Sequence, residues 1–530
     1  MIFKSLSVTQ AMAGLVFTLC LGLFILMAYG GIRTADGEIV FRTGEALATR
    51  GSLALTEDLA AWPGFAVARG VDGRIYSVFA PGQSLVLAPI VRLAQTINQT
   101  RWIENRGWEV PVSFTVDGNS LRDYLLDRTP VQTGPHTLRF LVSFFIPLIT
   151  ALVVVVYFFV IRRLTASLPA ALIAALLLAL ATPLWSYASM MFKEPLTLLW
   201  VLLSFYRLIG GEVSPTDQEK NGRLFLPGLL LGLAFLTHIR AVLFVPFFLV
   251  YGVGSWNGDG AGGRWSRRRL AAALSFMAGF SIPAAVFGWL NYVRFGHALE
   301  TGRLISPVTY GAFVPPWEGL GGLLVSPGKG LFWFCPLVVL GLASWPRLHR
   351  VNPRLSMMLA GAIVFHWVFL ACRSDWHGGF CLGPRYLLPI LPFLLIPVAV
   401  VLSGWSFSAP PTRPDRFRRR LLALFFTGCV VQQVYFCLGE PVSFYYLLKQ
   451  YGLERGVSII SDNSIYFSWR TSPLFSLLQA NRGPFLLQNL PLNNYALWAL
   501  AGATMALIIR LVFRLADFLH RQAAKNTGCL

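Results

Sequence analysis

The sequence contains few charged residues for its length. Asp, Glu, Lys and Arg make up 13% of its 530 residues, about half of the ~25% found in an ordinary soluble domain. Hydrophobic residues make up 55%, and they occur in long runs. These features exclude a water-soluble globule, a collagen-like chain and a disordered chain, and they indicate a membrane protein.

The seven cysteines are scattered and form no metal-binding pattern. The chain has no Cys-x-x-Cys pair and no His and Cys cluster at zinc spacing. Cys372 and Cys381 share a short loop, so they either form a disulfide, if that loop faces an oxidising compartment, or remain free thiols. The other cysteines are expected to serve as apolar packing.

Long apolar runs predict an all-α integral membrane protein with about twelve transmembrane helices, because a span needs ~20 mostly apolar residues. The first run, at 11–31, is too long for the apolar part of a signal peptide and lacks a cleavage site, so we expect an uncleaved anchor. The other runs lie at about 136–161, 168–190, 191–210, 224–237, 241–254, 270–292, 331–346, 356–372, 386–404, 421–438 and 495–515.

The basic residues predict the orientation. Lys and Arg outnumber Asp and Glu by 44 to 24, a net charge of +20. With the N-terminus inside, every basic cluster between the predicted spans falls on the cytoplasmic side, including Arg162 with Arg163 and the run from Arg267 to Arg269. We therefore expect both termini inside, and we attribute most of the charge excess to topology and not to nucleic-acid binding.

This topology divides the chain into five parts. They are a first transmembrane helix (1–31), an outer loop with juxtamembrane helices and a catalytic acid (32–135), transmembrane helices 2 to 11 (136–438) with outer loops at 294–330 and 373–385, an outer loop (439–494), and a last transmembrane helix with a short cytoplasmic tail (495–530). Because the long loops lie outside, we expect the functional site on the outer face.

Two acids, Asp36 and Glu38, directly follow the first span. The residues after them alternate as expected for a short amphipathic helix at the membrane surface, and a second such helix is expected at 80–93. Since Asp-Gly is also ordinary turn chemistry, the acids alone do not prove a catalytic site.

Other ionisable residues lie at the predicted outer membrane surface, where they commonly mark a site. Glu194, before Pro195, is also explained as a helix start. His238 and Arg240 link two short spans, where an interfacial anchor is the alternative. Lys329, flanked by glycines, can contact a single phosphate as a point charge.

The loop at 373–385 is the densest polar cluster of the predicted outer face. Asp375 and His377 are too few for a metal site. Arg385, just before an apolar run, is either an anchor or a phosphate ligand. Trp376 lies beside His377, and aromatic residues at this depth also occur as an interfacial belt.

Seven short motifs occur in order along the chain. They are the acids Asp36 and Glu38; Gly-Arg-Ile-Tyr-Ser with Pro-Gly-Gln-Ser-Leu at 73–85; Glu-Pro at 194–195; Thr-x-x-Arg at 237–240; Asn-Tyr-x-Arg-Phe-Gly at 291–296; Ser-Pro-Gly-Lys-Gly-Leu at 326–331; and Trp-x-Gly-Gly with Gly-Pro-Arg-Tyr-Leu-x-Pro at 376–389. This series resembles the GT-C superfamily of membrane glycosyltransferases that use polyprenyl-phosphate sugar donors, in particular the branch of aminoarabinose transferases and protein O-mannosyltransferases.

The resemblance implies a GT-C fold and an inverting displacement, with polyprenyl phosphate as the leaving group and no cofactor. It implies a carboxylate base, for which Asp36 is the first candidate and Glu38 the second or a supporting residue. The candidates for the donor phosphate are Arg385, Lys329 and Arg240. The candidates for substrate binding are Tyr76, Glu194, His238, Trp376 and His377. Because arginine can neutralise a monophosphate, and the outer side has no Asp-x-Asp pair, we expect no metal.

The implied partners are a polyprenyl-phosphate-linked sugar, an acceptor of the envelope (a lipid, a glycan or a protein) and membrane lipids. The implied location is the bacterial cytoplasmic membrane, with the site facing the periplasm. One departure is that many relatives have a lysine between the Tyr and Pro-Gly motifs, where this chain has Val78, Phe79 and Ala80. The alternatives are a transporter or flippase, and a ligase or polymerase of the O-antigen type.

Overall fold

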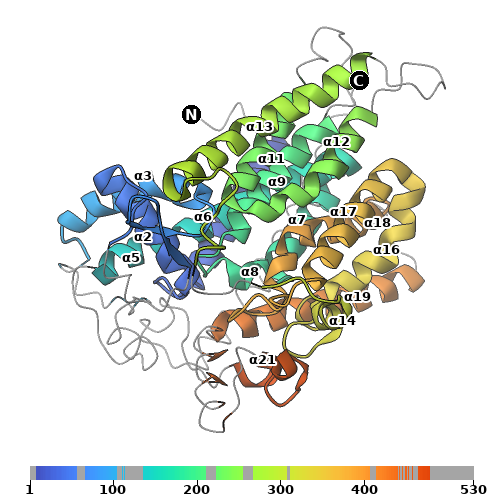
Figure 1. Cartoon of the computed structure of the whole chain (residues 1–530). Coiled ribbons are helices and arrows are strands. Elements are labelled where there is room, and N and C mark those ends of the chain that lie inside the picture. The colour runs from blue at the N-terminus through green and yellow to red at the C-terminus, as the bar shows by residue number, and fades with distance from the viewer. Residues whose placement is uncertain are drawn as a thin grey trace.

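The computed structural model is a helical bundle with a smaller helical layer against one side (Figure 1). It describes residues 7–56, 66–103, 105, 110, 113, 135–210, 223–254, 267–306, 311–405, 413–439, 441, 444–445, 448–449, 452, 456 and 463–477. Over these ranges the structure is almost entirely helical, and one two-stranded sheet is present.

Most of the predicted spans coincide with helices. Within the described ranges, six helices are long and apolar enough to cross a membrane. They are α1 (Val8–Leu26), α5 (Pro135–Ser143) continued by α6 (Phe145–Thr165), α13 (Arg267–Phe295), α17 (Pro353–Ala371), η6 (Arg385–Ile390) continued by α18 (Leu391–Ser403), and α19 (Arg413–Leu438). The all-α membrane class is confirmed. The count of twelve is not, and the predicted span at 495–515 lies outside the described residues.

Shorter helices complete the bundle. They are α7 (Leu168–Leu180), α9 (Glu194–Ile209), α11 (Phe225–Thr237), η5 (Ile239–Phe244), α12 (Val245–Gly254) and α16 (Leu337–Val351). α7 is apolar and buried around almost its whole circumference, between α6 and α18. A helix without a polar face belongs at the centre of a bundle, so α7 forms its core.

Two predicted spans were wrong in extent because their sequences interrupt the helix. The segment at 168–190 was predicted as one span, but α7 ends at Leu180, and Pro183 begins the single-turn helix α8 (Leu184–Tyr187). The segment at 331–346 is broken between α15 (Leu331–Phe334) and α16, at Pro336. Proline has no backbone N–H and clashes with the preceding turn, so it starts a new helix at each place.

The smaller layer contains the two helices that the sequence predicts after the first span. They are α2 (Ala35–Arg50) and α3 (Gly82–Gln99), and both predictions of a helix are confirmed. The two helices pack together, and the Ser84 hydroxyl on α3 donates a hydrogen bond to the Val40 carbonyl oxygen on α2 at 2.9 Å. This layer places the start of α2 against the turn that precedes α9.

An antiparallel hairpin joins this layer to α13. Its strands are β1 (Val67–Arg69) and β2 (Ile75–Ser77). Arg294, near the end of α13, donates from Nη1 to the Ser77 carbonyl oxygen at 2.8 Å, and its own carbonyl oxygen accepts from the Val71 amide at 3.0 Å. The loop after α13 is thereby held beside the hairpin. The remaining elements are α14 (Trp317–Val325), η7 (Asn463–Phe467) and α21 (Pro473–Ser476).

Candidate active site

Asp36 lies in the first turn of α2. The Thr34 side chain caps this helix by accepting a hydrogen bond from the Gly37 amide at 2.9 Å. A side chain at Gly37 would collide with Met191, so α2 approaches the turn before α9 closely at this point. The cap and the glycine together fix the Asp36 carboxylate beside that turn.

Arg385 connects Asp36 with Glu194. It is the first residue of η6, it is buried, and its Nη1 donates to Asp36 Oδ2 at 3.2 Å. Its Nε lies 3.3 Å from Glu194 Oε1. The guanidinium carbon lies 4.3 Å from the ring centre of Phe192. Three residues that are far apart in the sequence, and that were all predicted as site residues, therefore form one buried centre.

Glu194 has unused hydrogen-bonding capacity in this centre. It is the first residue of α9 and is buried, and its Oε2 has no hydrogen-bond partner among the described residues. A buried carboxylate oxygen without a hydrogen-bond partner lowers the stability of the folded protein by about 1–3 kcal/mol or more. This oxygen is suited to accept a hydrogen bond from a bound substrate.

Glu38 lies in a different cluster. Its side chain is fully buried, Oε1 accepts from Arg42 Nε at 2.8 Å, and Oε2 accepts from Arg139 Nε at 2.8 Å. Arg139 belongs to α5, so Glu38 ties α2 to α5. Both oxygens are engaged, and this placement favours a structural role for the second candidate base.

Arg240 and His238 border the Arg385 centre. The Arg240 guanidinium carbon lies 3.4 Å from the ring centre of Tyr386, whose ring also lies 4.9 Å from the corresponding carbon of Arg385. His238 Nδ1 accepts from the Arg240 amide at 3.3 Å. Burial, followed by the charge of Arg240, holds the pKa of His238 well below its ordinary value, so the ring is neutral at pH 7.

Lys329 holds the loop that leads to Arg385. Its Nζ donates to the carbonyl oxygens of Gly379, at 2.7 Å, and Cys381, and it lies 4.5 Å from the ring centre of Tyr445. Burial lowers the pKa of this ammonium to about 8. The structure thus brings Lys329 to the Arg385 loop, with its donors directed at backbone carbonyls.

Trp376 and His377 lie on the same loop in an aromatic cluster. Trp376 Nε1 donates to Glu318 Oε1 at 2.8 Å. The His377 ring stacks on Tyr466 at 4.6 Å, and its Nδ1 accepts from the Gly379 amide at 3.0 Å. Burial lowers the pKa of His377 to about 3, so the ring is neutral. These two predicted substrate residues support the loop through contacts within the protein.

Tyr76 belongs to the hairpin. It is buried, its hydroxyl donates to Asp72 Oδ2 at 2.7 Å, and its ring meets Phe295 edge to face at 6.1 Å. Burial, followed by the hydrogen bond to Asp72, raises the pKa of Tyr76 to about 12. The structure therefore places Tyr76 where it anchors the hairpin on α13.

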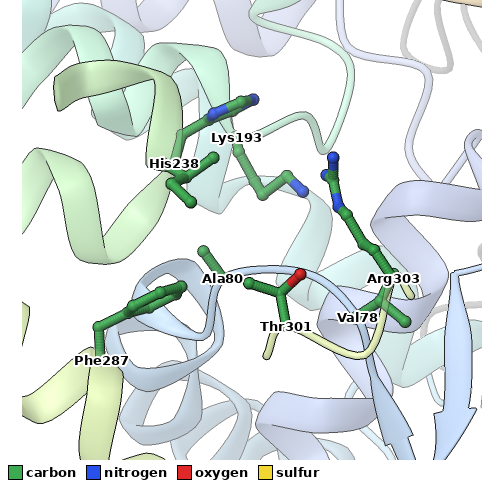
Figure 2. A pocket seen from close by; sticks show the side chains of 8 residues that line it. Val78, Ala80, Lys193, His238, Phe287, Thr301 and Arg303 are labelled. Atoms are coloured by element: carbon green, nitrogen blue, oxygen red, sulfur yellow. The ribbon is translucent and has the colours of Figure 1, made fainter. Parts of the chain in front are cut away.

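Two basic residues beside the centre were not among the candidates. Lys193, directly before α9, and Arg303 both line a pocket with about 380 Å³ of atom-free space, part of it open to solvent (Figure 2). The predicted residue His238 lines it too. The signal for Lys193 was its place beside Glu194 at the membrane surface, and no sequence pattern marked Arg303.

No metal cluster is found in the part of the chain that the structure describes, where no three His, Cys, Asp or Glu side chains are grouped to hold an ion. The absence of a metal requirement stays a prediction. Cys372 and Cys381 are both free thiols in the structure, so the disulfide alternative is not formed.

A bundle of apolar helices with buried acids and arginines at one of its ends defines a class of membrane-embedded protein with an ionic site. Residues 123–299 match the family model of dolichyl-phosphate-mannose-protein mannosyltransferase. This region includes α9 with Glu194, and the turn with Arg240, whereas Asp36 and Arg385 lie outside it. Over this segment the chain is similar to a family of glycosyltransferases named for a dolichyl-phosphate sugar donor. This match supports the enzyme over the transporter alternative.

Solved structures of two proteins are similar to the chain. ArnT from Cupriavidus metallidurans in the apo state is 16% identical, with a TM-score of 0.48, over 91% of this chain and 76% of that chain. The same protein bound to undecaprenyl phosphate is 14% identical, with a TM-score of 0.44, over 89% of this chain and 75% of that chain. The third structure is the oligosaccharyltransferase AglB from Archaeoglobus fulgidus, in complex with an inhibitory peptide and a dolichol-phosphate. It is 13% identical, with a TM-score of 0.44, over 80% of this chain and 56% of that chain. No curated protein sequence matches the chain.

Proposed function

We propose that the protein transfers a sugar from a polyprenyl-phosphate donor to an acceptor of the cell envelope, by inverting displacement. The observation that carries the proposal is the ionic bridge from Asp36 through Arg385 to Glu194. It combines a carboxylate suited to take a proton with a cation suited to stabilise a leaving phosphate. The family match and the donor lipids named for ArnT and AglB support this choice of donor.

In this mechanism Asp36 is the general base. The acceptor hydroxyl oxygen attacks the anomeric carbon while the bond from that carbon to the phosphate oxygen breaks, and the electron pair leaves with the phosphate. The hydroxyl proton passes to the Asp36 carboxylate. The hydrogen bond from Arg385 holds this carboxylate in one orientation, which favours the reaction by fixing the base before the substrate arrives.

The guanidinium of Arg385 also meets the leaving phosphate. It carries a permanent charge and several N–H donors in one plane, a geometry that matches the oxygens of a phosphate. Arg240 supports it from beside the same Tyr386 ring. Lys329 contributes by fixing the loop at 378–383, and the free oxygen of Glu194 accepts a hydrogen bond from the sugar.

The site faces the outer side of the cytoplasmic membrane, where lipid-linked sugars are used to build the envelope. Support for this orientation comes from the positive clusters, because segments rich in Lys and Arg usually stay on the cytoplasmic side. The acceptor is a lipid, a glycan or a protein of the envelope. The five-part division of the chain predicted from the sequence is retained here, with 32–135 as the outer loop that carries the base.

A donor comparison tests the proposal. The purified full-length protein, in nanodiscs with envelope extract as acceptor, would be given a radiolabelled sugar on undecaprenyl phosphate, on undecaprenyl diphosphate or on a nucleotide. We expect transfer of label from the monophosphate lipid alone. Transfer from the diphosphate lipid would favour a ligase or polymerase, and transfer from none of the three would contradict the proposed function.

A further inference from the structure

The pocket beside Asp36 gathers positive charge within an apolar frame. Lys193, His238, Thr301 and Arg303 supply its polar lining, and the rest is formed by Val78, Ala80, Ile239 and Phe287. Figure 2 shows the Lys193 ammonium and the Arg303 guanidinium reaching into the same space, with the Thr301 hydroxyl directed toward it. A pocket with a few convergent polar groups and apolar walls is the usual form of a ligand site.

Among the described residues, Lys193 has no anionic partner at contact distance. The residue is buried, with 8% of its surface exposed, and no carboxylate in the described ranges lies within ion-pair distance of its Nζ. The ammonium lies 3.4 Å from the ring centre of Phe79, so a π face is its close contact. The neighbouring carboxylates, Asp36 and Glu194, are both paired with Arg385. A buried cation in this setting favours an added anion.

The turn that carries Arg303 and Thr301 is firmly built. Gly302 has a φ of +85°, a conformation that favours glycine. The Glu300 carboxylate accepts from the Gly302 amide at 2.6 Å. Gly302 also packs against Phe295 and Val78, so this turn is fixed against α13 and the hairpin. The second positive charge of the pocket is therefore presented by a rigid segment.

The apolar walls indicate what the anion is attached to. Phe287 lies on α13, one of the helices able to span the membrane, and Ile239 begins η5 and is partly exposed. α13 exposes further apolar side chains, Ile282, Val286 and Trp289, in the same stretch. An oxyanion with a long apolar chain satisfies both parts of this lining, with its head at the cations and its chain along α13.

We infer that Lys193 and Arg303 form the subsite that receives the phosphate of a polyprenyl-phosphate lipid, as donor and as product. Resting on the proposed function, this inference adds two residues to the site and places the phosphate between the Lys193 turn and the Arg303 turn. Arg385 then meets the phosphate from the Asp36 side. The lipid chain leaves the pocket between α13 and η5.

Lipid binding to the full-length protein in nanodiscs tests the inference. The probes are undecaprenyl phosphate, undecaprenol without phosphate, and inorganic phosphate. The variants are Lys193→Met and Arg303→Gln, and the matched controls are Lys449→Met and the exposed Arg350→Gln, neither of which lines the pocket. Lys193→Arg keeps the charge, and the thermal stability of each lipid-free variant shows that it is folded.

We expect both pocket variants to weaken binding of undecaprenyl phosphate by about tenfold or more, because each removes a charge-assisted contact. Binding of undecaprenol should be unchanged in every variant, and Lys193→Arg should bind almost as the wild type does. Wild-type affinity of folded Lys193→Met and Arg303→Gln for undecaprenyl phosphate would overturn the inference. An equal loss for undecaprenol would also overturn it, because the pocket would then recognise the chain.

The inorganic phosphate arm separates a lipid phosphate site from a free phosphate site. Inorganic phosphate, at the concentration at which undecaprenyl phosphate saturates the protein, should not displace the lipid. Displacement of the lipid at such a concentration would overturn the lipid assignment. The result is also separate from the proposed function. If the variants lose lipid binding but the wild type transfers no sugar, the subsite stands and the transferase function is rejected. If the wild type transfers sugar but the variants bind the lipid normally, the transferase function stands and the subsite is rejected.

Discussion

Arg385 is the residue on which the ionic centre depends. It holds Asp36 and Glu194, which come from α2 and α9, through one buried guanidinium. A lysine would offer a single point of charge here, whereas the planar guanidinium reaches both carboxylates at once. The same group is therefore responsible for orienting the base and for keeping two acids together.

We expect Arg385→Gln to destabilise the protein and to reduce transfer. Removal of one partner of a buried ion pair costs about 3–5 kcal/mol, and loss of a donor aimed at developing charge lowers the rate about 100-fold or more. Thermal unfolding in detergent and sugar-transfer rates measure the two effects. The double variant with Glu194→Gln should regain stability but not transfer. A fully stable and active Arg385→Gln would contradict this assignment.

Lys193 predicts a pH dependence of phosphate binding. Burial is the main reason that the pKa of its free ammonium is lowered to about 7, with Arg303 and Arg385 acting in the same direction and Asp36 and Glu194 opposing it. A bound phosphate favours the charged form and raises this pKa. Above pH 7 the amine must therefore take up a proton when phosphate binds, and affinity falls as the pH rises.

The affinity for undecaprenyl phosphate should fall by up to about tenfold per pH unit between about pH 7 and pH 9. In Lys193→Arg the slope should disappear, because arginine stays charged throughout. His238 lines the same pocket but stays neutral over this range, since its pKa is held well below its ordinary value. A wild-type slope in Lys193→Arg would assign the titration to another group.

At this scale the sequence could identify the three residues of the ionic centre. Asp36, Glu194 and Arg385 could be predicted because ionisable residues at a membrane surface are few, and each stood in a recognisable motif. Arg303 could not, because its role depends on a turn beside the hairpin that no local pattern reveals. Nor could the sequence show that Lys329, Trp376 and His377 direct their polar atoms at the protein itself.

At the scale of elements, α2 carries two acids, Asp36 and Glu38, that are two residues apart and lie in different clusters. Asp36 accepts a hydrogen bond from Arg385, and Glu38 points to α5, where Arg139 holds it together with Arg42 of α2 itself. Two residues along a helix differ by about 200° in direction. The prediction of a helix after the first span was therefore sufficient to separate the two acids, but not to say which of them faces the site.

We expect Glu38→Gln to loosen the contact between α2 and α5. The neutral amide leaves Arg139 without its buried counter-charge, with a loss of stability of about 3–5 kcal/mol. Transfer per folded molecule should stay close to the wild type, because neither oxygen of Glu38 faces substrate. The measurements are thermal unfolding and the transfer rate of the folded fraction. Normal stability with abolished transfer would instead support a chemical role for Glu38.

The breaks in the helices were harder to predict than the helices. Runs of apolar residues gave no sign that α7 ends at Leu180, since the residues after it remain mostly apolar. The turn between α8 and α9 carries Lys193, and it ends where Pro195 occupies the first turn of α9. Hydropathy alone cannot separate a continuous span from one that is interrupted beside a site.

At the scale of the whole molecule, the helices bring the site to the end of the bundle near α2, α8 and η6, and the turn between α16 and α17 lies at their other ends (Figure 1). The excess of positive charge follows this division, because the basic clusters flank the spans at the predicted inner ends. The positive charge of the proposed site is supplied by Arg240, Arg303, Arg385 and Lys193.

Cysteine labelling tests the orientation. We expect Arg74→Cys, on the exposed hairpin turn, to react in intact cells with a thiol reagent that does not cross the membrane. Arg350→Cys, exposed at the end of α16, should react only after the membrane is opened. Wild-type protein is the background, because its described cysteines are mostly buried. The opposite pattern would invert the topology and place the site inside.

Sugar transfer by Asp36→Asn from a donor linked to undecaprenyl phosphate tests the role of Asp36 most directly. Asparagine still accepts the hydrogen bond from Arg385 but cannot take a proton from the acceptor. We expect a transfer rate lower by about 100-fold or more, with thermal stability and undecaprenyl phosphate binding close to the wild type. Wild-type turnover by this variant would contradict the assignment of Asp36 as the base.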